Sequence, residues 1–275
     1  MGTRTVTSLP YFNCGGVLTD SHDAEKALIQ EAIALAQKLG AKHLELRHRR
    51  DHHLELPRRT NKVSVVLPVE SDEDKMLKSF RHEVRTKIRK ANKSGLTGEM
   101  CGEDGLDAFY AVFAQNMRDL GTPVYSKKFF QEILRTFPDD TYICVVRHQG
   151  QPVASSLLTG YRETLETVWG SSLREYLAMA PNMLMYWRML RFAAEKGFRV
   201  FDFGRSSTGS GPHRFKLQWS SQEVQFYWDY WLPPGKTLPE LNPDNPKFRA
   251  AIWAWQRLPV GVTKILGPRI VRCLP

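Results

Sequence analysis

The 275-residue sequence has little cysteine, with only Cys14, Cys101, Cys144 and Cys273. No two of them form a CxxC pair, so the sequence predicts neither a zinc cluster nor a disulfide framework. We therefore expect no metal site, and we expect the chain to work in a reducing, bacterial cytoplasm.

Long apolar runs are also absent. The first twenty residues lack the apolar core of a signal peptide. No segment approaches the roughly 18 apolar residues that a membrane-spanning helix requires. Any contact with a membrane is therefore expected to be peripheral.

The sequence also lacks the common nucleotide-binding motifs. In the segment 201–220, FDFGRSSTGSGPHRFKLQWS, Gly204 and Gly209 have the spacing of a P-loop, but Ser210 and Gly211 replace the required Lys-Ser/Thr pair. This excludes an NTPase of that type. No GxGxxG motif opens a helix after the first strand, so a dinucleotide-binding fold has no fingerprint here.

Two further chemical patterns are weak. The run HRRDHH at 48–53 lacks an HExxH motif, and we expect it to form a solvated loop. Ser206, His213 and Asp202 have the residue types of a hydrolase triad, but no GxSxG elbow accompanies them.

Positive charge is abundant. Lys and Arg number 39 against 29 Asp and Glu, which gives a net charge of +10. Such a chain favours anionic partners such as RNA, a membrane surface or an acidic substrate. Six cations lie between 81 and 93, on a predicted helix that could contact tRNA or anionic lipid, or form a solvated face.

The hydrophobic pattern alternates between helical and extended periods. It predicts an α/β fold with a mixed sheet, divided into segments 1–70, 71–100 (a linking helix), 101–235 and 236–275 (a helical tail). Helices are predicted over 23–40, 71–95, 105–119, 126–137 and 182–196, and strands start at His43, Lys62, Thr141, Pro152, Thr164, Arg199 and Glu223.

The tail places Ile252, Trp253 and Trp255 in a helical pattern, with basic residues between the apolar ones. This pattern is typical of a helix that packs against the body of its own chain. It also suits an interfacial segment that contacts a membrane peripherally.

The segment 181–219 resembles the C-terminal signature of the FemAB-like family. There, a helix ending in Gly leads to a strand with Phe-Asp-Phe-Gly, a glycine-bearing loop and Phe-Lys-x-x-Trp. The segments LPYFNCGGVL at 9–18 and NMRDLGTPVYS at 116–126 resemble the branch associated with exosortase (PEP-CTERM) exopolysaccharide systems. The resemblance extends from about 9 to 232, although Ser220 stands where the motif usually has Gly.

This resemblance implies a GNAT-like acyltransferase fold with a mixed central sheet, preceded by a shortened, partial GNAT-like lobe. It implies N-acyl transfer to an amine of a cell-envelope or exopolysaccharide precursor, which would be an anionic small molecule or lipid-linked. The acyl donor would be aminoacyl-tRNA or acyl-CoA, and no cofactor would be tightly bound. No glycine lies between Gly170 and Gly197, so the usual glycine-rich cradle for CoA is missing.

The residues after the predicted strand at 199 are the candidates for catalysis. Lys216 and Arg205 would supply positive charge for a phosphate-bearing substrate or an oxyanion, and His213 could accept the proton of the amine. If the segment around Lys216 is extended, Arg214 and Lys216 share one face.

Other residues are candidate substrate contacts or loop anchors. The strand end with Trp169 and Ser171 is where a GNAT sheet would open to admit the acyl group. The predicted substrate contacts are Arg118, Tyr125, Trp169, Ser171, Tyr176, Asn182, Ser206 and Arg214, and the predicted structural loop residues are Asp202, Gly204, Gly209 and Gly211.

Two alternatives to a FemAB-like transferase stay open. The chain could be a non-catalytic module that binds an anionic glycan-lipid or RNA through the same basic residues. It could also be a CoA-dependent acetyltransferase with an unusual cradle. The sequence indicates no particular oligomeric state.

Overall fold

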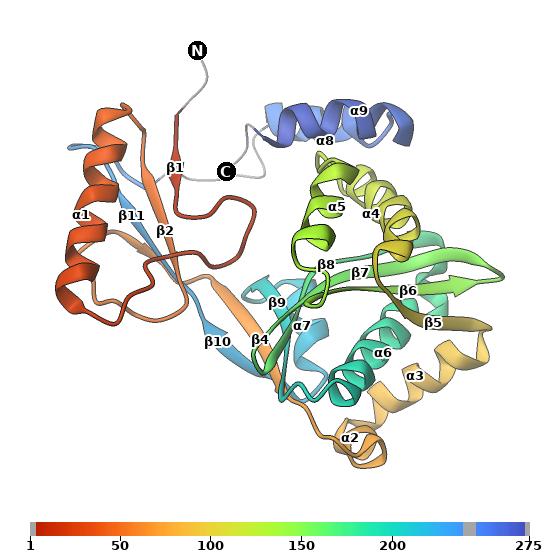
Figure 1. Cartoon of the computed structure of the whole chain (residues 1–275). Helices are drawn as coiled ribbons and strands as arrows, with labels where there is room; N and C mark the ends of the chain where they lie inside the picture. The colour runs from red at the N-terminus through yellow and green to blue at the C-terminus, as the bar shows by residue number, and fades with distance from the viewer. Residues whose placement is uncertain (1–3, 239–245, 273–275) are drawn as a thin grey trace.

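The computed structural model describes residues 4–238 and 246–272 and contains a large, mixed β-sheet (Figure 1). Seven strands form it in the order β10-β4-β9-β8-β7-β6-β5. All neighbours in this sheet are antiparallel except β8 and β9, which are parallel. This confirms the predicted α/β fold with a mixed central sheet. The strands are β4 (Lys62–Pro68), β5 (Leu96–Cys101), β6 (Thr141–His148), β7 (Gln151–Tyr161), β8 (Thr164–Ser172), β9 (Val200–Ser207) and β10 (Gln222–Gln225).

A smaller sheet forms the N-terminal lobe. Its order is β1-β2-β11-β3, from β1 (Val6–Thr7), β2 (Leu44–His48), β11 (Tyr227–Trp231) and β3 (Arg58–Arg59). The helix α1 (His22–Lys38) packs beside β2. The two sheets do not follow the division at residue 70: β4 belongs to the large sheet, whereas β11 returns to the small one.

Helices cover both faces of the large sheet (Figure 1). On one face, α3 and α6 enclose a core that includes Phe201, Phe203 and Trp219. On the other face, α4 and α5 enclose a second, aromatic core around Phe109 and Phe130. These helices are α3 (His82–Lys93), α4 (Leu106–Leu120), α5 (Lys127–Thr136) and α6 (Pro181–Glu195), with short 3₁₀ turns at Glu103–Gly105 and Arg174–Met179.

The predicted single helix over 71–95 is wrong. The chain forms α2 (Glu73–Ser79) and then α3, with a break at Phe80, whose ψ of 151° is extended. The ring of Phe80 is buried and packs edge-on against Trp187 and Trp219. Met76, Phe80, Val84 and Ile88 are buried at intervals of four residues, as they would be in one continuous helix, so the hydrophobic period does not reveal the break.

The predicted aromatic strand starting at Glu223 is two strands in different sheets. β10 pairs with β4, whereas β11 pairs with β2 and β3. Between them, Phe226 is buried and its N–H donates to Lys62 O at 3.0 Å. A period-two pattern continues across this junction, so the sequence alone does not show where the chain leaves one sheet for the other.

The extended segment predicted around Lys216 is also wrong, because it forms the helix α7 (Gly211–Leu217). Ser210 caps this helix, its Oγ accepting from His213 N at 3.3 Å, and Pro212 occupies the first turn. Ser followed by Pro in the first turn is a helix start signal. In the helix, Arg214 is exposed and Lys216 is buried, so the two do not share a face.

The run HRRDHH leaves β2 at His48 and continues as a loop in which Arg49, Arg50 and His53 are exposed, as expected, but two of its histidines are not solvated. His48 and His52 are buried, because each ring meets a carboxylate from another element. His48 Nδ1 lies 2.9 Å from Asp229 Oδ2, and His52 Nδ1 lies 2.7 Å from Glu25 Oε2. Over the described ranges, no three His, Cys, Asp or Glu side chains gather in an arrangement that could hold a metal ion.

The tail forms α8 (Pro246–Trp255) and α9 (Val260–Val271), which lie at the edge of the molecule near α4 and α5 (Figure 1). Residues 239–245 and 273–275, including Cys273, lie outside the described residues. Within the described residues, no helix combines the length and the hydropathy needed to cross a bilayer.

Candidate functional site

The parallel strands β8 and β9 separate after a short paired stretch. They pair only at Thr164 with Val200, Leu165 with Phe201, and Glu166 with Asp202. Beyond this point β9 turns away at Gly204, whose φ is +71°. A Cβ at this position would lie 2.6 Å from Thr167 O, so glycine is required there.

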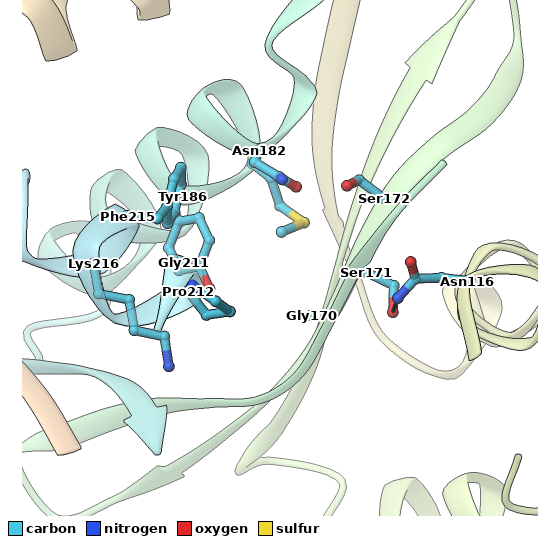
Figure 2. A pocket seen from close by; sticks show the side chains of 11 residues that line it. Asn116, Gly170, Ser171, Ser172, Asn182, Tyr186, Gly211, Pro212, Phe215 and Lys216 are labelled. Atoms are coloured by element: carbon cyan, nitrogen blue, oxygen red, sulfur yellow. Dashed lines mark hydrogen bonds between the residues drawn. The ribbon is translucent and has the colours of Figure 1, made fainter. Parts of the chain in front are cut away.

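A cavity of about 330 Å³ lies beside the separated strands, and we call it the central cavity. Figure 2 shows side chains from α6 and α7 on one side of it and side chains from β8 and α4 on the other. Its lining combines amide and hydroxyl groups with aromatic and aliphatic ones. The lining residues are Asn116, Gly170, Ser171, Ser172, Asn182, Met185, Tyr186, Gly211, Pro212, Phe215 and Lys216.

The predicted contacts Ser171 and Asn182 both line this cavity. Asn116 Nδ2 donates to Ser171 Oγ at 3.1 Å, which fixes one polar wall. Asn182 does not cap α6, because Ala180 is the N-cap residue, with φ of 60°. Asn182 instead lies in the first turn, at the helix end that carries partial positive charge.

Lys216 is the buried cation of the site. Its Nζ donates to Gly204 O at 2.8 Å and to Arg205 O at 3.0 Å. An ammonium has three donors, so these two carbonyls leave one donor for a ligand. Burial lowers the pKa of Lys216 to about 8, although the charges of Asp202 and Glu166 oppose this shift.

Glu166 lies beside this lysine on β8 and was not predicted from the sequence. Burial, followed by the charge of Asp202, raises the pKa of Glu166 to about 7. Asn13 Nδ2 donates to Glu166 Oε1 at 3.3 Å, which ties the carboxyl group to the N-terminal lobe. A carboxyl group with this pKa can accept and return a proton near neutral pH.

Asp202, one of the predicted structural loop residues, accepts hydrogen bonds at the turn of β9. Its Oδ1 accepts from Gly204 N at 2.8 Å and from the Ser64 hydroxyl, and its Oδ2 lies 3.2 Å from an Arg49 guanidinium nitrogen. The charge of Asp202 also raises the pKa of both Glu166 and Lys216.

The other two predicted catalytic side chains do not line the central cavity. Arg205 Nε donates to Asn13 Oδ1 at 3.0 Å, and its guanidinium carbon lies 5.4 Å from the centre of the Trp228 ring. The side chain of Arg205 therefore turns towards the N-terminal lobe, and only its carbonyl reaches Lys216.

His213 is buried and holds the loop. Its Nδ1 accepts from Gly209 N at 3.0 Å, and its Nε2 lies 2.6 Å from Glu223 Oε1. Its Nδ1 is thus bonded within the loop and its Nε2 faces the Glu223 carboxylate, so the ring does not line the central cavity. Gly209, with φ of +76°, forms the turn that brings its N–H to this ring.

The remaining polar candidates point elsewhere. Arg118 forms a helix-end ion pair with Asp119 at 2.7 Å and donates to Leu258 O at 3.3 Å. The exposed Arg214 donates to Gly209 O at 2.5 Å. Tyr176 donates to Gln151 Oε1 at 3.3 Å, near the β6–β7 turn. None of these three side chains reaches the central cavity.

The aromatic candidates and Ser206 are also outside this cavity. Trp169 and Tyr125 belong to the aromatic core under α4 and α5, with ring centres 6.2 Å apart. Alternation along β8 sends Trp169 to that face. Ser206 Oγ is buried, and its hydroxyl has no hydrogen-bond partner among the described residues.

Among the lining residues, sequence reasoning missed Asn116, Met185, Tyr186, Pro212 and Phe215. It also missed Glu166, whose charge interacts with Lys216, and Asn13, which bonds to Glu166 and Arg205 outside the lining. The signal for Glu166 was a single carboxylate within an otherwise uncharged strand, Thr164–Ser172. Asn13 lay inside the quoted segment 9–18 but was given no role. Tyr186 looked like one of many apolar positions on α6, and the tertiary contact with the cavity gives it a place in the site.

Comparison with solved structures shows the same overall fold in other proteins. FemX is 15% identical over 81% of this chain and 79% of FemX, with a TM-score of 0.58. L-PGS from Bacillus licheniformis is 14% identical over 90% of this chain and 79% of its own, with a TM-score of 0.59. The C-terminal domain of a putative lysylphosphatidylglycerol synthetase from Agrobacterium fabrum is 12% identical over 76% and 74%, with a TM-score of 0.57. At these identities the likeness shows the fold.

Comparison of the sequence with curated proteins and with family models identifies the family of this chain. No curated protein matches the chain significantly. The family model described as an acetyltransferase (GNAT) domain matches residues 78–217, just over half of the chain, and this range contains α3 to α7 and the central cavity. The chain therefore belongs to the family of proteins with an acetyltransferase (GNAT) domain.

Proposed function

We propose that this protein transfers an acyl or aminoacyl group to an amine in the central cavity. The observation that carries the proposal is Lys216, a buried lysine that lines this cavity and whose charge acts on Glu166. A cation and a proton acceptor of adjusted pKa, next to an opening in a GNAT sheet, suit acyl transfer better than passive binding.

Each step can be assigned to a group of this chain. The acceptor amine attacks the carbonyl carbon of the donor, so a C–N bond forms while the ester or thioester bond breaks. Glu166 is outside the lining of the cavity, so this step requires the amine to bind between Lys216 and Glu166. There Glu166 takes the proton that the amine loses and returns it to the departing oxygen or sulfur. The remaining donor of Lys216 stabilises the negative oxygen of the tetrahedral intermediate.

The polar wall orients the substrates. Asn182, Ser172 and the bonded pair Asn116 and Ser171 offer hydrogen bonds on either side of the central cavity. Apolar side chains of α6 and α7 would cover the acyl chain. Water exclusion by these groups strengthens the interaction of Lys216 with a developing charge.

We further infer that the acceptor is a cell-envelope or exopolysaccharide precursor, either a small anionic molecule or a lipid-linked one. The FemAB-like motif at 181–219 supports this proposal, and so does the fold shared with a putative lysylphosphatidylglycerol synthetase, whose name describes a lipid product. The donor is aminoacyl-tRNA rather than acyl-CoA, because the segment before α6 is a glycine-free 3₁₀ turn at Arg174–Met179.

An intact-mass transfer assay tests the proposal. The protein is offered aminoacyl-tRNA and acyl-CoA in parallel, with a nucleotide-sugar peptide that carries a free amine. We expect product from aminoacyl-tRNA, and Lys216→Met should reduce the rate about 10²-fold or more, as loss of an oxyanion donor does. Lys128→Ala, which removes an exposed lysine, is the matched control.

Two results would overturn the proposal. One is a wild-type protein that binds a donor but transfers nothing, which would favour the non-catalytic binding module. The other is a rate for Lys216→Met equal to that of the control. Product from acyl-CoA alone would retain acyl transfer but reverse the choice of donor.

A further inference from the structure

The helix α9 is fixed to the body of the protein by one face. Thr263, Gly267 and Val271 are buried and recur every four residues along this face. A Cβ on Gly267 would lie 2.8 Å from the backbone N and O of Val124, so the helix contacts the body without an intervening side chain. This close contact makes α9 a docked part of the structure.

Outside this buried face, α9 and part of α8 expose several large apolar side chains. Their large apolar side chains are between 37% and 65% exposed, and Trp253 and Ile265 are the most exposed of them. Figure 1 shows both helices at one edge of the molecule. We call this set the apolar tail surface: Ile252, Trp253, Val262, Ile265, Leu266 and Ile270.

The charged residues of the tail itself have one sign. Residues 246–272 contain six Lys and Arg and no Asp or Glu. The Arg257 guanidinium carbon lies 3.7 Å from the centre of the Trp253 ring, and Arg257 is exposed. A segment that exposes apolar side chains and whose charges are all cationic complements a lipid surface with negative headgroups above apolar acyl chains.

We propose that the apolar tail surface docks this protein on an anionic lipid membrane, with α8 and α9 lying in the plane of the interface. The 12 residues of α9 cannot cross a bilayer. They are long enough to place Ile265 and its neighbours at the boundary between headgroups and acyl chains, while the cations contact lipid phosphates. This inference stands independently of the proposed acyl transfer.

The tail also connects to the helix that borders the central cavity. Arg118 donates to Leu258 O, and Gln256 Nε2 donates to Asp119 O at 3.0 Å. Both contacts are on α4, the helix whose Asn116 lines the cavity. Docking through the apolar tail surface therefore brings that wall of the central cavity close to the lipid surface.

Vesicle co-sedimentation of the full chain tests this surface. Vesicles of phosphatidylcholine with about one third phosphatidylglycerol should bind the protein, and added salt should weaken the binding. Neutral phosphatidylcholine vesicles should bind it more weakly. The double variant Trp253→Glu with Ile265→Glu should reduce binding to anionic vesicles by about tenfold or more, because carboxylates do not enter the interface.

Leu35→Glu on α1, which changes an equally exposed leucine in the N-terminal lobe, is the matched control. Circular dichroism establishes that the variants fold. Absence of binding to anionic vesicles would overturn the proposal, and so would equal binding by the double variant. A dimer that the double variant abolishes, without vesicle binding, would assign the surface to a second copy instead. Transfer to a soluble amine should be unchanged in the double variant, so this test and that of the proposed function fail separately.

Discussion

The two sheets of this protein are stabilised by different means. Beneath the large sheet, the core contains rings and aliphatic chains, with Phe201, Phe203 and Trp219 fully buried. In the small sheet, by comparison, many of the buried side chains are charged or titratable. Glu45 and Arg47 pair at 2.6 Å, and Tyr230 donates to Glu45 at 2.7 Å.

The buried charges of the small sheet are closely paired. Asp229 accepts from Arg58 Nε at 2.6 Å and lies 2.9 Å from His48 Nδ1. At the border between the sheets, by contrast, burial outweighs the available partners of Glu166 and Lys216, and their pKa values move towards neutrality. The difference teaches that paired burial produces structure, whereas incompletely compensated burial produces groups ready for proton transfer.

The largest expected effect on stability is in the small sheet. Asp229→Ala leaves His48 and Arg58 without their shared carboxylate, so we expect the free energy of unfolding to fall by about 3–5 kcal/mol. Urea denaturation measures this change. Asp139→Ala, at an exposed carboxylate, should change it by less than about 0.5 kcal/mol. A similar small change for Asp229→Ala would contradict the role given to this pair.

The next largest expected effect is an increase in the free energy of unfolding, and it concerns Glu166 at the border between the two sheets. Glu166→Gln should raise the free energy of unfolding by about 1–3 kcal/mol at pH 8 and have little effect at pH 4. The reason is that the folded pKa of Glu166, about 7, lies above its ordinary value of 4.5. The protonated Glu166 therefore stabilises the folded state fully below pH 4.5, and this stabilisation is lost as the pH rises through about 7.

Denaturation at several pH values checks this prediction, with Glu163→Gln, an exposed position, as the control. The transfer rate gives a second readout, because it should lose its rise near pH 7 in Glu166→Gln. An unchanged pH profile would remove Glu166 from the proton transfer, and equal stabilisation by both variants would contradict the effect of burial.

The smallest effect is the response of the small sheet to acid. The hydrogen bond from His52 lowers the pKa of Glu25, so its stabilising contribution is complete above about pH 4.5 and is lost as the pH falls through the lowered pKa. His52→Phe should remove part of this acid dependence, as followed by circular dichroism. His22→Ala changes only an exposed histidine 3.8 Å from Glu25 and should have less effect. Equal acid profiles for both variants would show that the His52 contact is unimportant.

Local sequence patterns were sufficient for most of the large sheet and its helices. The strands from Thr141 to Ser172 and the helices α4, α5 and α6 lie where periodicity and start signals predicted them. Patterns failed where the sequence period continues across a break in the structure. The buried positions 76, 80, 84 and 88 keep a helical spacing across the break at Phe80, and Phe226 lies between two strands of different sheets that alternate continuously in sequence.

The sequence by itself determined the fold class and the glycine turn at Gly204, because these depend on local periodicity and on a motif of consecutive residues. It also made Lys216 a candidate catalytic residue. Only the tertiary structure decided which polar groups meet. In the structure, His213 Nδ1 accepts from Gly209 N and its Nε2 faces Glu223, while the Arg205 guanidinium lies over the Trp228 ring. The charge of Glu166 interacts with that of Lys216. Burial and pairing arise between segments far apart in the chain, and they set the pKa values on which the proposed chemistry depends.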